Sequence, residues 1–245
     1  MDKKYFNNIY YDVLAFYFWE PQHLGKKKNP DNKLNNSDKV MDHLSKMEVS
    51  LNHILSIFFS LAPKSFFNYF FQQAFNKYQN DSFIEDSDFV GEIGEAMQPD
   101  FFFVGSKQII AVEMKINAIS NLEQLMKYLL LNVIYQEKKK TSLPYKILFL
   151  GPGKFEDLWE ESCKNTIELK KAFKNYKFPA ETKKGEIKLN KYISRINLLL
   201  NKCEISHMNY NDFSQILKKE QKTSNEVYAK LLAGMINELK NRGLI

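Results

Sequence analysis

The stretch from Gln98 to Asn117 constrains this chain most, because it places charged side chains in two strongly apolar segments. The first segment is Asp100–Val104 and the second is Ile109–Ile116, and both are rich in Phe, Ile and Val. Such short apolar runs predict buried β-strands. A charge in a buried strand is costly unless it has a partner or a function. The charged residues are Asp100, Glu113 and Lys115.

Side-chain alternation predicts how these charges are arranged. Successive residues of a strand point to opposite faces, so Glu113 and Lys115 share one face of the second strand. The loop Gly105–Lys107 is short and begins with glycine, which favours a hairpin between the two strands. Pro99 suits the first position of a strand, where no ladder donor is required. If the strands pair, Asp100 lies at the same end of the hairpin as Glu113 and Lys115.

Two carboxylates beside an ammonium group have a known chemical use. Carboxylate oxygens hold Mg²⁺ or Mn²⁺, and a nearby lysine can position a water or neutralise charge that develops on a phosphate. These are the parts that phosphodiester hydrolysis requires. The alternative interpretation is a surface hairpin with a simple ion pair between Glu113 and Lys115.

The order Pro-Asp, twelve residues, then Glu-x-Lys resembles the PD-(D/E)xK nuclease superfamily, with Pro99, Asp100, Glu113 and Lys115 in the motif positions. The resemblance implies a restriction endonuclease-like α/β fold, in which a mixed central sheet is flanked by helices. It also implies a Mg²⁺-dependent or Mn²⁺-dependent deoxyribonuclease. In that case Asp100 and Glu113 hold the metal, with the Met114 carbonyl as a further ligand, and Lys115 acts on the water or the transition state.

A second motif follows one element downstream. The pattern Ser120-Asn121-Leu122-Glu123 is typical of a capping box and predicts a helix from Asn121 to about Glu137. Gln124 and Tyr128 are four residues apart and therefore project from one face of this helix. They resemble the Gln-x-x-x-Tyr motif of the RecB-like branch of the superfamily, which implies a supporting role beside the substrate. The alternative is an ordinary amphipathic helix.

A third carboxylate is sought upstream. The segment Met47–Phe59 predicts a helix whose apolar stripe includes Met47, Leu51 and Phe58. Glu48 lies on or beside this stripe, and the resemblance offers it a role at the metal; a first-turn glutamate favoured by the helix dipole is the alternative. Glu92 and Glu95 compete for the role, since 88–95 can form a short strand beside Asp100. We rank Glu48 first and Glu92 second.

The rest of the chain is expected to be mostly helical. We predict one nuclease-like domain over 1–245, with a mainly helical part at 1–80, a motif-bearing α/β core at 81–215 and a C-terminal helix at 216–245. Further strands are predicted at 145–150 and 204–208. The phenylalanines of the helix at 65–78 favour a packed core or an oligomer contact, including a homodimer, over base stacking.

Composition agrees with a polyanionic partner. Lys and Arg number 35 against 29 for Asp and Glu, a formal net charge of +6, which is compatible with a polyanion. The resemblance to the PD-(D/E)xK superfamily implies that this partner is DNA. Two cysteines without framework spacing predict a reducing compartment, and no stretch has the length of a membrane span, so we expect a cytoplasmic protein. The alternative function is binding without catalysis: the chain would keep the nuclease fold but only bind nucleic acid or a protein partner.

Overall fold

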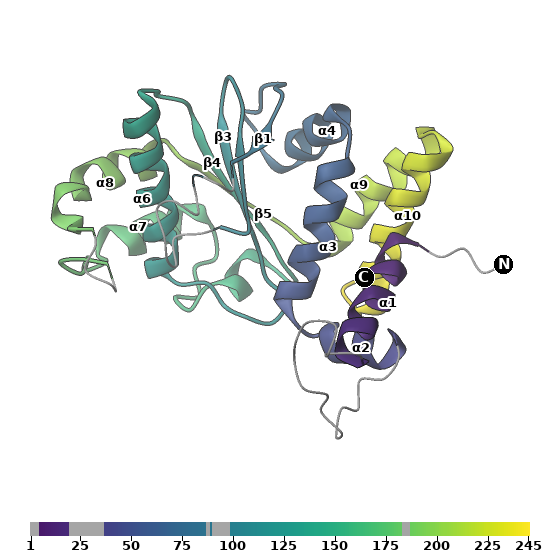
Figure 1. Ribbon diagram of the computed structural model, residues 1–245. Coiled ribbons are helices and arrows are strands. Elements are labelled where there is room, and N and C mark those ends of the chain that lie inside the picture. Colours follow the sequence, from purple (N-terminus) through teal and green to yellow (C-terminus); the bar gives the residue numbers. More distant parts are fainter. Residues whose placement is uncertain (1–4, 20–36, 87–88, 90–98, 183–186) are drawn as a thin grey trace. The chain divides into compact units, whose positions relative to one another are not determined.

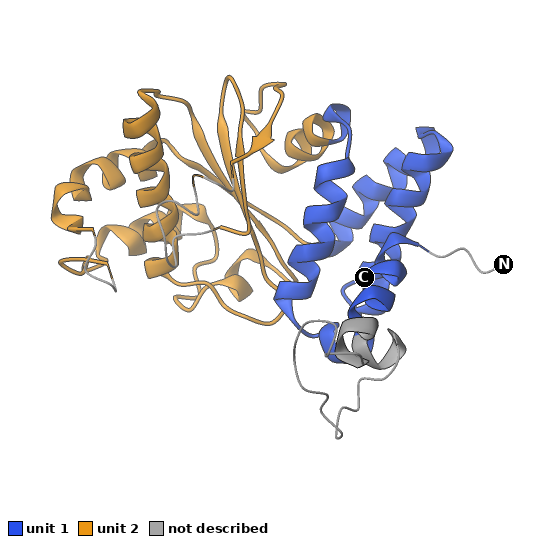
Figure 2. Cartoon of the chain, in the orientation of Figure 1, with its two compact units in different colours: residues 1–66, 210–245 blue, residues 67–209 orange. Residues whose placement is uncertain are grey.

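The structure is a computed structural model that describes residues 5–19, 37–86, 89, 99–182 and 187–245 (Figure 1). The chain divides into two compact units, which are coloured separately in Figure 2. Unit 1 combines Met1–Phe66 with Tyr210–Ile245, and unit 2 is Phe67–Asn209. Unit 2 contains all the motif residues between Pro99 and Tyr128, so it is described first.

Unit 2 is built on a five-stranded mixed sheet in the order β1-β2-β3-β4-β5. The first two pairings are antiparallel and the last two are parallel. This makes the unit an open α/β structure, as the sequence predicts, and the strands at 145–150 and 204–208 are confirmed. The strands are β1 (Ile84–Glu85), β2 (Phe101–Val104), β3 (Ile109–Met114), β4 (Tyr145–Leu150) and β5 (Glu204–Met208).

The predicted hairpin is formed by β2 and β3, whose register pairs Phe101 with Val112 and Val104 with Ile109. The Gly105 amide donates to the Gln108 carbonyl at 2.9 Å and closes the loop. Glycine is required here by space, because a Cβ on Gly105 would lie 2.2 Å from Oδ2 of Asp81.

Asp81 fastens this loop from outside the hairpin. Its carboxylate is buried and accepts hydrogen bonds from the amides of Ser82, Ser106 and Lys107 and from the Ser106 hydroxyl, at 2.7 to 3.1 Å. Burial acts to raise the pKa of Asp81, but these hydrogen bonds outweigh it and the pKa is lowered overall.

One face of the sheet is covered by the helices α6 (Leu122–Lys139), α7 (Thr166–Lys174) and α8 (Ile193–Lys202), seen together in Figure 1. Side chains of β3 and β4 that point to this face, such as Ala111 and Ile147, are completely buried in one cluster with Leu125 and Leu129 of α6. The chain reaches α6 directly from β3 and returns through it to β4, which makes a parallel crossover possible.

The opposite face carries aromatic packing. Phe103 of β2 contacts the rings of Phe67, Phe71 and Phe83 at centroid distances of 5.3 to 6.5 Å. Phe67 and Phe71 belong to α4 (Lys64–Ala74), which crosses the boundary between the units. The preference for core packing over base stacking in this helix is therefore supported by the contacts of these rings.

Unit 1 is helical, with α1 (Phe6–Trp19), α2 (Ser37–Leu44), α3 (Glu48–Leu61), α9 (Tyr210–Thr223) and α10 (Glu226–Asn241). Its buried Glu238 accepts from Arg242 Nε at 2.5 Å, from the Tyr11 hydroxyl at 2.6 Å and from Asn7 at 3.0 Å. Arg242 also donates to the carbonyls of Ser45 and Met47. This charged network joins α1 and α10 to the turn between α2 and α3.

Three local predictions need correction. The apolar pattern of residues 39–62 predicts one continuous helix, which is wrong, because α2 and α3 are separate helices. Met47 does not lie on the buried stripe: it is 46% exposed, whereas Leu51 and Phe58 are fully buried. The capping box at Ser120 is also wrong. Asn121 caps α6 by accepting from the Gln124 amide at 3.0 Å, since asparagine is a strong cap and stands one residue closer to the first turn.

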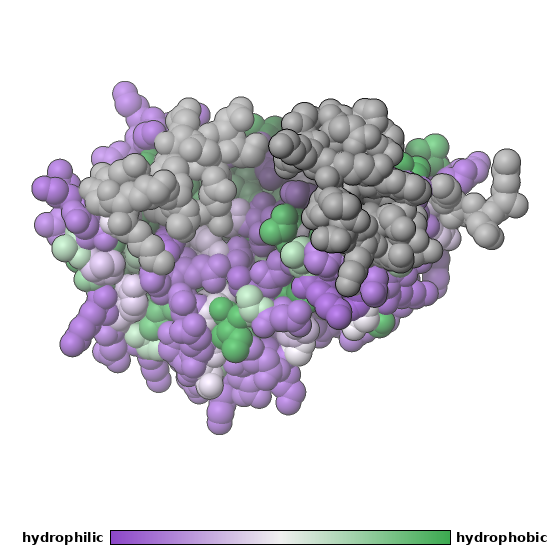
Figure 3. All heavy atoms as spheres, turned by 60° about the horizontal axis from the view of Figure 1, so that its bottom comes forward, coloured by the Kyte–Doolittle hydropathy of each residue, from purple (hydrophilic) through white to green (hydrophobic). Residues whose placement is uncertain are grey.

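The surface is mostly polar, as expected when the apolar residues are buried in the cores. The face drawn in Figure 3 is mainly hydrophilic among the described residues, and its hydrophobic residues form small, separate patches. Within the described ranges, every helix is too short or too polar to cross a membrane.

The lowered pKa of Asp81 makes the hairpin's stability depend on pH. A carboxyl whose pKa is lower in the folded state stabilises the fold above its unfolded pKa, and this stabilisation is lost as the pH falls. We expect Asp81→Asn to lower the free energy of unfolding by about 1–3 kcal/mol at pH 7. The difference from the wild type should shrink below about pH 4, where the aspartate itself becomes protonated.

Urea denaturation at pH 7 and pH 3 measures this difference. Asp42→Asn is the matched control, because the Asp42 side chain is exposed. If Asp81→Asn lowered the free energy of unfolding equally at both pH values, the Asp81 carboxylate would not stabilise the hairpin loop through its charge.

Candidate active site

The two predicted carboxylates lie opposite each other at the open end of the hairpin. Asp100 directly precedes β2, and continuing the register beyond Phe101 and Val112 places it across from Glu113. Its Oδ2 accepts a hydrogen bond of 2.6 Å from the Met114 amide, which fixes the half-buried Asp100 carboxylate against β3. The strand pairing therefore brings Asp100 and Glu113 together although they are thirteen residues apart in the sequence.

Glu113 is the buried centre of the site. It is 5% exposed, and its Oε1 accepts from Lys115 Nζ at 2.8 Å and from Gln124 Nε2 at 2.7 Å. Burial raises the pKa of Glu113, while the Lys115 ammonium acts in the opposite direction and stabilises the carboxylate. Lys115 is 6% exposed, so both members of this ion pair are withdrawn from bulk solvent.

Tyr128 lies one turn after Gln124 on the same face of α6. The residue is 1% exposed, and burial followed by the Glu113 charge raises the pKa of its hydroxyl. The hydroxyl is close enough to Glu113 for the two groups to act on each other's pKa, but the geometry is not that of a hydrogen bond. In the described part of the chain no other group bonds this hydroxyl. Helix spacing thus brings both motif residues to Glu113.

The site lies where parallel strands end and α6 begins. Glu113 and Lys115 are at the carboxyl end of β3, which is the edge where open α/β sheets bind ligands. Gly151 follows β4 there, and a Cβ on Gly151 would lie 3.3 Å from the Lys115 Cβ and 2.8 Å from a methyl of Leu158. Glycine at 151 therefore leaves the space beside Lys115.

Two further residues lie at this edge, and the sequence alone predicts no role in the site for either. Gly151 is typical of a Gly-Pro-Gly turn, and His207 has no ligand spacing to another histidine, which predicts a structural or surface role. The register pairs Glu113 with Phe149 and Phe149 with His207. The distance from His207 Nε2 to the Gly151 carbonyl oxygen is 3.3 Å. Their position at the ends of successive predicted strands was the available signal.

The upstream acid stays a prediction. Glu48 is the first residue of α3 and belongs to unit 1, where it is partly exposed. Glu92 and Glu95 lie outside the described residues, as does the strand expected at 88–95, apart from Phe89, which is helical.

The donors fit a hard divalent cation in part. Mg²⁺ prefers oxygen ligands, keeps several waters and is often held by one or two carboxylates, which Asp100 and Glu113 supply. Among the residues that the structure describes, no three His, Cys, Asp or Glu side chains cluster as a metal site. Waters, a carbonyl or the upstream acid would complete the ligand set.

The comparisons with known proteins assign no family. No protein-family model matches this chain. A search of curated proteins likewise finds no significant match. The fold and the site described above are therefore the basis of the functional argument.

The buried ion pair predicts coupled effects on stability. Glu113→Leu leaves the Lys115 ammonium buried without its partner, and we expect it to lower the free energy of unfolding by about 3–5 kcal/mol. Lys115→Met should also destabilise. The double variant Glu113→Leu/Lys115→Met should cost clearly less than the sum of the two, because it leaves no unpaired charge.

Chemical denaturation of the four proteins gives this coupling energy. Additive effects would show that Glu113 and Lys115 do not interact. The exposed pair Glu226 and Lys230, whose distance of 2.7 Å is similar, is the control and should couple only weakly.

Proposed function

We propose that this chain is a metal-dependent nuclease that hydrolyses DNA phosphodiester bonds. The observation that carries the proposal is the pairing of Asp100 with Glu113 across the hairpin, with Lys115 on the Glu113 carboxylate at 2.8 Å. The order and spacing of these residues resemble the PD-(D/E)xK nucleases. Gln124 on α6 adds a second motif residue at 2.7 Å from the same carboxylate.

Asp100 and Glu113 would hold Mg²⁺ or Mn²⁺, with Glu48 as the first candidate for a further ligand and Glu92 as the second. The bound cation supplies Lewis acidity toward a phosphoryl oxygen and a more acidic water. Asp100 is positioned for this by the Met114 amide, which holds one of its oxygens. The burial of Glu113 strengthens its interaction with any cation, because the site is partly screened from water.

Lys115 is the group that would act on the reacting atoms. Its ammonium lies at the carboxylate that would bind the cation, and so close to a phosphate held by that cation. From there it can orient the attacking water or stabilise negative charge that develops on the phosphoryl oxygens. Gln124 holds Glu113 from the α6 side, and the buried Tyr128 lies beside the same carboxylate; both would support the site next to the substrate.

DNA is proposed as the substrate for two reasons. The net charge of +6 favours a polyanion. The resemblance favours DNA over RNA, since that superfamily acts mainly on DNA. A setting in restriction, phage defence or repair is compatible with such an activity.

The test is a cleavage assay on linear and circular DNA with Mg²⁺ or Mn²⁺. We expect Asp100→Asn and Lys115→Ala each to reduce cleavage by a factor of about 10² or more, because each removes a group that acts in the transition state. Asp42→Asn and Lys230→Ala, at exposed sites, are matched controls and should cleave like the wild type. Cutting of circular DNA would identify an endonuclease.

Unchanged cleavage by the Asp100→Asn and Lys115→Ala variants would refute the site. A second measurement addresses a nuclease fold without catalysis. If Mg²⁺ raises the melting temperature of the wild type but not of Glu113→Gln, the metal binds at Glu113. No cleavage together with no such effect of Mg²⁺ on the melting temperature would leave a nucleic-acid-binding or protein-binding module as the better function.

A further inference from the structure

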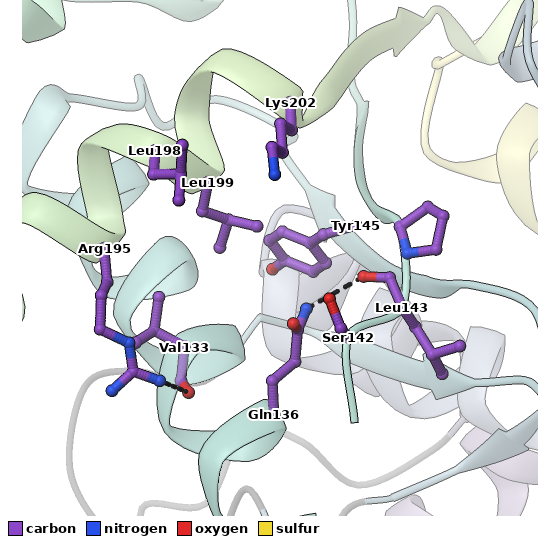
Figure 4. A pocket seen from close by; sticks show the side chains of 10 residues that line it. Val133, Gln136, Ser142, Leu143, Tyr145, Arg195, Leu198, Leu199 and Lys202 are labelled. Carbon is purple, nitrogen blue, oxygen red and sulfur yellow. Dashed lines mark hydrogen bonds between the residues drawn. The ribbon is translucent and has the colours of Figure 1, made fainter. Parts of the chain in front are cut away.

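Unit 2 contains a pocket away from the candidate active site. It has a volume of about 390 Å³ and lies between the second half of α6, the start of β4 and α8 (Figure 4). Tyr145 at the start of β4 pairs with Ile109, whereas the active-site end of β3 pairs with Leu150. At about 3.3 Å per residue the two sites are separated by roughly 15 Å along the strands.

The pocket has an apolar floor and wall. Leu143, Leu198, Leu199 and the ring of Tyr145 line it, and Figure 4 shows the Leu199 side chain directed toward the Tyr145 ring. Leu198 is 56% exposed and leaves apolar surface at the mouth of the pocket. The volume lies within the range that small organic ligands occupy.

Two cationic side chains complete the pocket. The Arg195 guanidinium is held in place by Glu137 Oε2 at 2.9 Å and by the Val133 carbonyl at 3.4 Å, and it lies over the Tyr192 ring. Lys202 lines the opposite side of the pocket, and Figure 4 shows its ammonium directed toward the Tyr145 ring. Glu137 balances one of the two positive charges, so the pocket keeps a positive charge.

We propose that this pocket binds a small organic anion with a compact apolar body, carrying a carboxylate, sulfonate or phosphate group. Lys202 would bind the anionic group, and Arg195, seven residues earlier on α8, would add positive potential from the other side of the pocket. The leucine side chains with Tyr145 would cover the body. This site is independent of the proposed nuclease activity.

The pocket is also joined to the active-site helix by its floor. The Tyr145 hydroxyl donates to the Tyr128 carbonyl at 3.2 Å, and Val133 and Gln136 of the pocket lie on the same helix as Gln124. Gln136 in turn donates to the Leu143 carbonyl at 3.0 Å, a contact drawn in Figure 4. These bonds make the pocket a preformed feature of the core and not a gap between loose side chains.

The test uses 8-anilino-1-naphthalenesulfonate as the anionic probe, with leucine methyl NMR as the site-specific readout. We expect the probe to shift the methyl signals of Leu143, Leu198 and Leu199. The double variant Arg195→Met/Lys202→Met should bind it at least tenfold more weakly. Lys171→Met/Lys174→Met removes two exposed charges from α7 and is the matched control, with unchanged affinity expected.

Two further measurements separate the apolar contribution to binding from the charged one. Inorganic sulfate alone should bind far more weakly than the probe, and Leu198→Glu, a change at an exposed position, should abolish binding by placing a negative charge at the mouth. The proposal is overturned if the probe leaves the wild-type leucine signals unshifted. It is equally overturned if the Arg195/Lys202 variant binds as well as the control, or if sulfate alone binds as tightly as the probe. Melting temperatures of all variants establish that they are folded.

Discussion

Unit 2 is organised around the Glu113 carboxylate, which is buried inside an apolar sheet. A buried carboxylate without partners is prohibitively costly, and part of this cost is offset here by Lys115, by Gln124 and by the backbone of Asp100, although burial still raises the pKa of Glu113 overall. Each partner comes from a different place: the same strand, the next helix and the neighbouring strand. The hairpin and the start of α6 are thus held in one arrangement by a single charge, and this arrangement is the candidate active site.

The surrounding fold makes this arrangement possible through small residues and caps. Gly105 leaves room for the Asp81 carboxylate that fastens the hairpin loop, and Gly151 leaves room for Lys115 at the end of β4. Asn121 caps α6 and so starts the helix where Gln124 can reach Glu113. The candidate active site lies at the carboxyl ends of the parallel strands, where the crossover helix begins and where other open α/β sheets bind their ligands.

Unit 1 uses buried charge in a different way. Glu238 and Arg242 have fully buried side chains, and their remaining hydrogen-bonding groups are largely used by Tyr11, Asn7 and backbone carbonyls. Such a densely hydrogen-bonded network specifies how helices pack. Each network leaves one buried polar atom without a hydrogen bond within the described residues, the Asn7 Oδ1 in unit 1 and the Tyr128 hydroxyl beside Glu113. Only the Glu113 network also brings a second carboxylate, that of Asp100, to the same edge.

The sequence by itself determined the strands β2 to β5, the hairpin and the convergence of Asp100, Glu113 and Lys115, because period-2 alternation and a short glycine loop are local properties, whereas the two-residue β1 was not predicted. Helix spacing likewise placed Gln124 and Tyr128 on one face. Only the tertiary structure decided that Asn121 and not Ser120 caps α6, that Gly151 and His207 share the edge of the candidate site, and that Arg195 and Lys202 line one pocket. Ser120 is held in a bridge to Trp159, and the edge and the pocket depend on contacts such as that of Val133 with Arg195, which are 62 residues apart. No local pattern encodes such a distance, because packing and strand register set it.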